Sequence, residues 1–106
     1  MQLTLKIYEG KEVIKTYTAE TVDFSFGVIE DILDALDFEH MSSQTEIATM
    51  IVKASKQLKP FLMDIFDGVT ADEIRNTRMQ NLIEVFRGLY QYATKELGAA
   101  AGDAKN

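Results

Sequence analysis

The chain has 106 residues, of which 46% are hydrophobic and 26% are charged, with no cysteine and a formal net charge of −6. This length provides enough core for one domain, the lack of cysteine excludes disulfides and thiolate metal sites, and no apolar run approaches the roughly 18 residues that a membrane span needs. The first residues lack the basic and apolar segments of a secretory signal, so we expect an intracellular protein without membrane contact.

The negative charge is concentrated in one segment. Residues 19–46 contain eight acidic and no basic side chains, whereas residues 1–18 and 47–106 each carry a net charge of +1. The acidic segment would repel phosphate backbones, and no basic stripe elsewhere compensates for it. We therefore expect no nucleic-acid partner.

The N-terminal residues predict a β-hairpin. Residues 2–8 (QLTLKIY) alternate polar and apolar side chains, as a half-buried strand does. Residues 9–11 supply a turn, and residues 12–18 are rich in β-branched and aromatic side chains. Because a lone hairpin is only marginally stable in water, we expect it to pack on helices.

The acidic segment predicts a helix that begins after Ser25 as N-cap and ends at about Phe38. Its core side is expected at helical spacing on Ile29, Ile32, Leu33 and Leu36. Its other side carries Glu30, Asp31, Asp34 and Asp37. Four carboxylates on one helix face without a neighbouring histidine form neither an acid–base pair nor a metal cage by themselves, so a solvated or partner-facing surface is the favoured interpretation.

Residues 43–46 have the form of a capping box and begin a helical stripe that reaches Ile65. Pro60 lies within this stripe and removes the hydrogen bond to the carbonyl of Lys56, so the segment is either one kinked helix or two helices with the proline opening the second. We expect the kink. The glycine at Gly68 ends the segment.

Two further capping signals follow. Residues 70–73 predict a short helix, and residues 77–80 predict the start of a last helix that runs to about Leu97. The apolar arc of this last helix covers about half of its circumference, which is more than an ordinary surface helix needs. Either the helix is central to the bundle, or one flank of it contacts another molecule. That flank would be formed by Val85, Leu89 and Tyr92.

Together these elements predict an α+β fold, mainly α, in which an N-terminal β-hairpin packs on a bundle of about four helices. Residues 1–97 are expected to form the domain and residues 98–106 a flexible C-terminal tail. The single histidine, His40, is expected to be an exposed linker residue. No phosphate-binding glycine loop, zinc motif or EF-hand pattern occurs, so we expect no enzyme activity, no cofactor and no metal.

Three stretches carry a resemblance to a known family: LTLKIYEGKEVIKTY, TVDFSFGVIEDILDALD and LKPFLMDIFDGVTADEIRNTRMQNLIEVF. In their order and spacing they resemble the tail assembly chaperones of long-tailed phages and prophages of Gram-positive bacteria. The resemblance implies a small, mainly helical protein that acts in the cytoplasm of the bacterial host, coats and solubilises the tape measure protein, and recruits tail tube protein. It also implies that the protein is absent from the finished virion.

The physics of that task agrees with the predicted elements. Many copies must mask a long helical partner together, so we expect a homo-oligomer, with related proteins thought to stack in a spiral. The hairpin would offer a strand edge to a neighbouring copy, and Val85, Leu89 and Tyr92 would contribute to a contact. The alternative from another class is a small structural tail component that is retained in the virion.

The last residues suggest one more hypothesis. In this family a longer, frameshifted product is commonly made from overlapping genes, and the sequence ending in Lys105 and Asn106 is compatible with the codons of a slippery heptamer. A flexible end is what a tethered second module would need. The codons of the gene would decide this.

Overall fold

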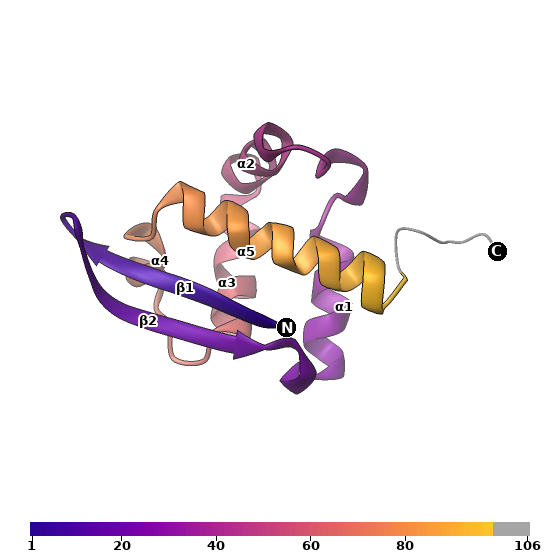
Figure 1. The fold of residues 1–106 in the computed structure, drawn as a ribbon, viewed down its shortest axis with the longest axis horizontal. Coiled ribbons are helices and arrows are strands. Elements are labelled where there is room, and N and C mark those ends of the chain that lie inside the picture. Colours follow the sequence, from indigo (N-terminus) through magenta and orange to yellow (C-terminus); the bar gives the residue numbers. More distant parts are fainter. Residues whose placement is uncertain (99–106) are drawn as a thin grey trace.

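The chain has the predicted mainly helical α+β fold. The computed structural model describes residues 1–98, in which a two-stranded antiparallel hairpin is followed by five α-helices (Figure 1). The strands are β1 (Gln2–Glu9) and β2 (Glu12–Glu20), and the helices are α1 (Phe26–Ala35), α2 (Gln44–Lys53), α3 (Ser55–Ile65), α4 (Ala71–Arg75) and α5 (Met79–Gln91). The short turns η1 (Thr21–Asp23) and η2 (Phe38–His40) flank α1, and a π-helical turn, η3 (Tyr92–Glu96), continues α5. The predicted tail beyond Gly98 lies outside the described residues, and so do Lys105 and Asn106.

The hairpin forms where the alternation predicted it. Its turn contains Gly10, whose φ of 63° lies in the left-handed region that glycine adopts without strain. The register passes from Ile7 opposite Lys15 to Tyr8 opposite Val13, so Ile14 is an extra residue in β2. Such a bulge increases the local twist and bends the tip of the hairpin.

One face of the hairpin packs on α5. Leu3, Leu5 and Ile7 are buried, as the alternation predicted, while the side chains of β2 are mostly exposed. A Cβ atom at Gly88 would lie 2.7 Å from Cδ2 of Leu3. The glycine therefore allows β1 to approach the helix closely.

Polar groups from outside the sheet occupy the free edge of β1. The Lys6 N–H donates to Asn81 Oδ1 at 2.7 Å, and Asn81 Nδ2 donates to the Thr4 carbonyl at 3.0 Å. Farther along the strand, the Tyr8 N–H donates to the Asn76 carbonyl at 2.9 Å. The amide of Asn81 thus pairs with β1 much as a neighbouring strand would, and it fixes the hairpin to the start of α5.

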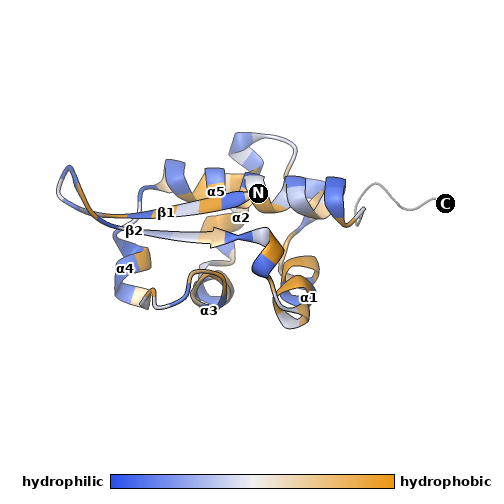
Figure 2. Ribbon diagram, turned by 60° about the horizontal axis from the view of Figure 1, so that its bottom comes forward, coloured by the Kyte–Doolittle hydropathy of each residue, from blue (hydrophilic) through white to orange (hydrophobic). Residues whose placement is uncertain are grey.

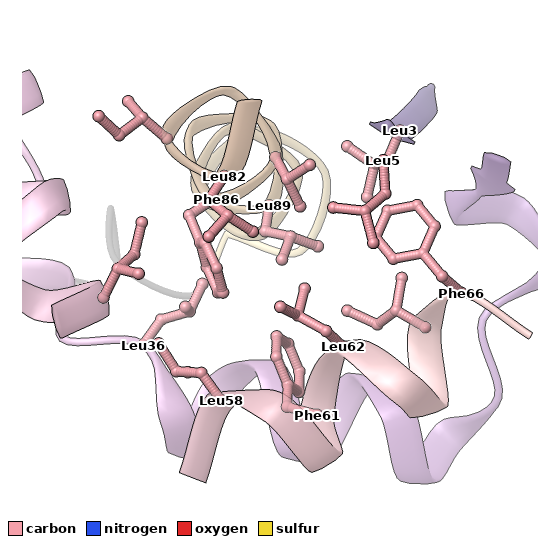
Figure 3. Close-up of a cluster of buried hydrophobic side chains, with 14 of the residues drawn as sticks. Leu3, Leu5, Leu36, Leu58, Phe61, Leu62, Phe66, Leu82, Phe86 and Leu89 are labelled. Atoms are coloured by element: carbon pink, nitrogen blue, oxygen red, sulfur yellow. The ribbon is translucent and has the colours of Figure 1, made fainter. Parts of the chain in front are cut away.

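The core lies between two layers. The hairpin and α5 form one layer, and α1 and α3 lie beneath it (Figure 2). Leucine and phenylalanine side chains from β1, α3 and α5 meet in the space between them (Figure 3). The rings of Phe61 and Phe86 are stacked with centroids 6.1 Å apart. This packing is the surface that the hairpin was expected to need.

Helix α1 begins where it was predicted but is shorter and rotated. The Ser25 hydroxyl accepts from the Val28 N–H at 3.2 Å, so the predicted N-cap is confirmed. The helix ends at Ala35 rather than at about Phe38, and Leu33, expected in the core, is 43% exposed. Ile32 and Leu36, also expected in the core, are buried, and α1 packs on α3.

The prediction of one kinked helix through Pro60 was wrong. The chain breaks at Ala54 (φ −105°, ψ 21°), six residues before the proline, and Pro60 lies inside α3. The Ala54 carbonyl accepts from the N–H groups of Gln57 and Leu58 and so starts the new helix. The chain changes direction between the two helices because α2 packs on α5, whereas α3 packs mainly on α1 and α4.

The capping signals had mixed outcomes. At α4 the Thr70 hydroxyl accepts from the Glu73 N–H, and the Glu73 carboxylate accepts from the Thr70 N–H, as the capping box predicted. At α5 the N-cap is Arg78, without a side-chain cap within the described chain, so the capping signal predicted at residues 77–80 was wrong. Thr77 instead directs its hydroxyl to the Glu73 carbonyl.

Candidate interaction surfaces

Val85, Leu89 and Tyr92, proposed from the sequence as a partner-contacting flank, are buried at 2%, 0% and 7% exposure. β1 covers α5 beside Gly88, and the ring of Phe24 meets that of Tyr92 edge-on at 5.7 Å. The chain's own N-terminal elements therefore occupy this flank, and the hypothesis that it faces outward is wrong for this structure. The alternative, that the helix is central to the bundle, agrees with the observed packing.

A groove of about 810 Å³ lies where the end of α1 and η2 face α2 and the start of α3. Its half-buried apolar floor contains Ala35, Met50 and Ala54. Small side chains, including Thr45, Thr49 and Ser55, line much of the remaining wall. Because small residues let another backbone approach closely, the shape suits a partner helix better than a small, deeply enclosed ligand.

The rim of this groove carries charges of both signs, with Lys53 and Lys56 on the α2–α3 side. On the other side, Nδ1 of His40 lies 2.8 Å from Oδ2 of Asp37, and this hydrogen bond raises the pKa of the imidazole above its ordinary 6.5. Hydrogen bonds from the Ser42 hydroxyl and N–H lower the pKa of Glu46 below 4.5. The rim is thus able to form ion pairs with a partner that carries both charges.

His40 was expected to be exposed, and its side chain is 65% exposed. Its only hydrogen-bonded partner among the described residues is the carboxylate of Asp37, which acts with it as an exposed ion pair when the imidazole is protonated. A carboxylate–imidazole pair needs a nucleophile or substrate-activating group to perform acid–base catalysis. His40 and Asp37 therefore form part of the charged rim of the groove.

The outer edge of β2 is open. On β1, backbone groups of Thr4, Lys6 and Tyr8 point away from β2. In an antiparallel ladder, the residues of β2 that lie opposite them point their own backbone groups away from β1. Two of these partners are Thr16 and Thr18, whose outward backbone groups have no partner within residues 1–98. This agrees with the strand edge expected from the sequence.

Sequence reasoning missed several large apolar side chains that are exposed. Val22 is 84% exposed, Phe26 is 74% exposed and Val52 is 62% exposed. Phe26 is the first residue of α1 and lies on the same helical line as Leu33, seven residues later, whereas Val22 belongs to the turn η1 before the helix. Large exposed apolar residues that gather in one place mark contact surfaces.

The part of the chain that the structure describes contains no group of three or more histidine, aspartate or glutamate side chains able to hold a metal ion. Within the same part, no helix is long and apolar enough to cross a membrane. Comparison with protein-family models, with curated proteins and with solved structures found no match.

Proposed function

We propose that this chain is a non-enzymatic tail assembly chaperone that binds a helical segment of a phage tape measure protein. The observation that carries the proposal is the groove with the apolar floor of Ala35, Met50 and Ala54, which has the small side chains and mixed charge that suit helix-in-groove binding. The specific partner rests on the resemblance of the hairpin, acidic helix and C-terminal stretches to this family.

The proposal includes the other properties that the resemblance implies. The protein keeps the tape measure protein soluble in the host cytoplasm, brings tail tube protein to it, in part through a longer frameshifted form, and leaves before the virion is complete. A tape measure protein exposes apolar stripes until the tube closes around it, so its chaperone needs broad, reversible contacts. The open edge of β2 and the exposed apolar residues provide additional contact area.

Filling the groove tests this function. Thr49 lies on the groove wall and is exposed, so Thr49→Trp should block a partner helix without disturbing the core. A tape measure fragment co-expressed with the parent chain should remain in the soluble fraction, and with Thr49→Trp most of it should precipitate. Gln91→Trp, at an exposed position of α5 outside this groove, is the matched control and should act as the parent does.

Two outcomes would contradict the proposal. If Thr49→Trp solubilises the fragment as well as the parent does, the groove is not the binding site. If mass spectrometry finds the chain in purified virions at a fixed copy number, the alternative of a structural tail component is correct.

A further inference from the structure

A second hollow, of about 320 Å³, lies where α2, α3 and α4 meet the start of α5. Its lining shares only Ser55 with that of the groove described above. Two of its side chains are large, apolar and open to solvent: Val52 is 62% exposed and Met79 is 41% exposed. The other apolar side chains of the lining belong to the core, namely Ile51, Leu58, Leu62, Ile74, Leu82 and Phe86. An apolar surface therefore continues from the core to the outside of the molecule.

The charged residues that line this hollow are both basic. Lys59 comes from α3 and Arg75 from α4, and no acidic side chain of residues 1–98 lines the hollow. Neither basic group forms an ion pair within that part of the chain, although the chain as a whole has a net charge of −6. Two cations without a carboxylate beside an apolar surface favour a ligand that combines apolar groups with negative charge.

The exposed side chains indicate how large this ligand is. A site for a small molecule encloses most of its ligand. Here the exposed apolar surface of Val52 and Met79 extends beyond the hollow, and methionine is common on surfaces that bind partner helices. The two basic groups come from different helices, so they favour carboxylates at two positions. A helix with apolar side chains one turn apart and carboxylates beside them on the same face provides both.

We propose that this hollow is a second docking site, which binds an acidic amphipathic helix of another protein. A cavity of roughly 150 Å³ holds a benzene molecule, so there is room for a large apolar side chain of the partner. The guanidinium of Arg75 would bind one carboxylate through two parallel hydrogen bonds, and the ammonium of Lys59 would attract another. Such pairs add specificity and salt dependence to a mainly apolar contact. The site does not rest on the proposed function.

Three designed peptides test the site. The first is a fluorescein-labelled helix of about 16 residues, a length that allows partial helix formation in water, with leucine and phenylalanine one turn apart and glutamates beside them. The second has lysine in place of every glutamate, and the third has serine in place of the two apolar anchors. In fluorescence anisotropy the parent chain should bind the acidic peptide about tenfold or more tightly than either of the others, and NaCl should weaken this binding.

Reversing the charge of the hollow tests the role of its two basic residues. Lys59→Glu with Arg75→Glu should bind the acidic peptide about tenfold or more weakly and should prefer the lysine peptide. Lys11→Glu with Arg87→Glu is the matched control, because it changes the net charge equally at two exposed residues outside the hollow. This control should stay within about twofold of the parent, since salt screens distant charges.

Removing an exposed apolar side chain tests the other half of the site. Val52→Ser should weaken binding of the acidic peptide by about fivefold or more and leave the circular dichroism spectrum unchanged, because Val52 is mostly exposed. Val13→Ser, at an exposed apolar position of the hairpin (46%), is its control and should bind as the parent does. In nuclear magnetic resonance spectra of the parent, the acidic peptide should shift the amide signals of Val52 and Arg75.

Three results would overturn the inference: equal binding of the acidic and lysine peptides by the parent, equal binding of the acidic peptide by the folded charge-reversed variant and its control, or shifted signals that lie outside the hollow. Sedimentation of the chain alone provides a fourth. If it shows association that Lys59→Glu with Arg75→Glu abolishes, the occupant is a second copy and not another protein. Thr49→Trp should bind the acidic peptide as the parent does, so failure of the proposed function is measured separately.

Discussion

Glu73 shows how much one side chain can connect in a small chain. Its carboxylate accepts from the Tyr17 hydroxyl at 2.6 Å and from the Thr70 N–H at 3.0 Å, and it lies 3.3 Å from Nζ of Lys15. The same residue therefore caps α4 and joins that helix to β2. The Tyr17 hydrogen bond is the largest of the causes that lower the pKa of Glu73 below its ordinary 4.5.

This lowered pKa gives a signed pH prediction. A carboxyl whose folded-state pKa is below the unfolded value contributes stability above the unfolded pKa, and the contribution is lost as pH falls through the folded pKa. Glu73→Gln should therefore reduce the free energy of unfolding at pH 7, with a difference that shrinks as the pH falls below 4.5 and the carboxyl of the folded chain takes up its proton. Urea unfolding at several pH values measures it, with Glu84→Gln, an exposed residue of α5, as the control.

A difference that stays constant across this pH range would contradict the electrostatic explanation. In that case the hydrogen bonds of Glu73, and not its negative charge, would join the hairpin to α4.

At the scale of elements, the docking of the hairpin depends on Asn81. Its side chain forms two hydrogen bonds to the backbone of β1, at Thr4 and Lys6. Asn81→Ala should lower the free energy of unfolding by about 1–3 kcal/mol, because two backbone groups lose their partner and one of them is partly buried. Chemical denaturation measures this loss.

Gln80→Ala is the matched control for Asn81→Ala. Within residues 1–98 the Gln80 side chain is hydrogen-bonded only to the exposed side chain of Gln44, so its removal should cost less than about 0.5 kcal/mol. Hydrogen exchange gives a local measurement as well. The Lys6 amide should exchange faster in Asn81→Ala but not in Gln80→Ala, and equal protection of Lys6 in both variants would rule out the anchoring role.

The presence of the strands and helices was predictable, because their hydrophobic periods of two and 3.6 residues can be recognised in short stretches of the sequence. The rotation of α1 was not, because Leu33 and Val28 both fit an apolar stripe and only the position of α3 decides which one is buried. The break at Ala54 was missed for a similar reason. The apolar spacing continues through it in register, and the change of direction comes from packing on α5 and α1.

The candidate site was less predictable than the fold. The floor of the groove consists of Ala35, Met50 and Ala54, whose residue types carry no chemical signature and which come together only when α1 meets α2 and α3. The wide apolar arc of the last helix was recognised, but the sequence does not show that β1 covers it. What covers a helix is a property of the tertiary structure.

At the scale of the whole molecule, the charges repel one another more than they pair. Residues 19–46 carry eight acidic side chains and no Lys or Arg. Within the described part of the chain the only ion pairs are Lys15 with Glu73 and His40 with Asp37. Uneven charge of this kind destabilises a compact state by self-repulsion, and salt screens it.

Salt should therefore raise the melting temperature of the isolated chain. An increase from about 0.02 M to 0.5 M NaCl should raise Tm by about 2–5 °C. Adding Asp31→Asn and Asp34→Asn should raise Tm at low salt and reduce the salt effect. Differential scanning calorimetry measures both, and a Tm that falls with NaCl would show that attractive pairs dominate.

The occupied edge of β1 has a consequence for how the chain behaves at high concentration. A cross-β fibril needs every strand to pair on both sides, so that one chain can template the next without end. Here an asparagine amide and a loop carbonyl already take the places of a neighbour along β1, and only β2 could accept a guest strand. Crowded copies could join one strand at most and would then stop, which separates orderly assembly from amyloid growth.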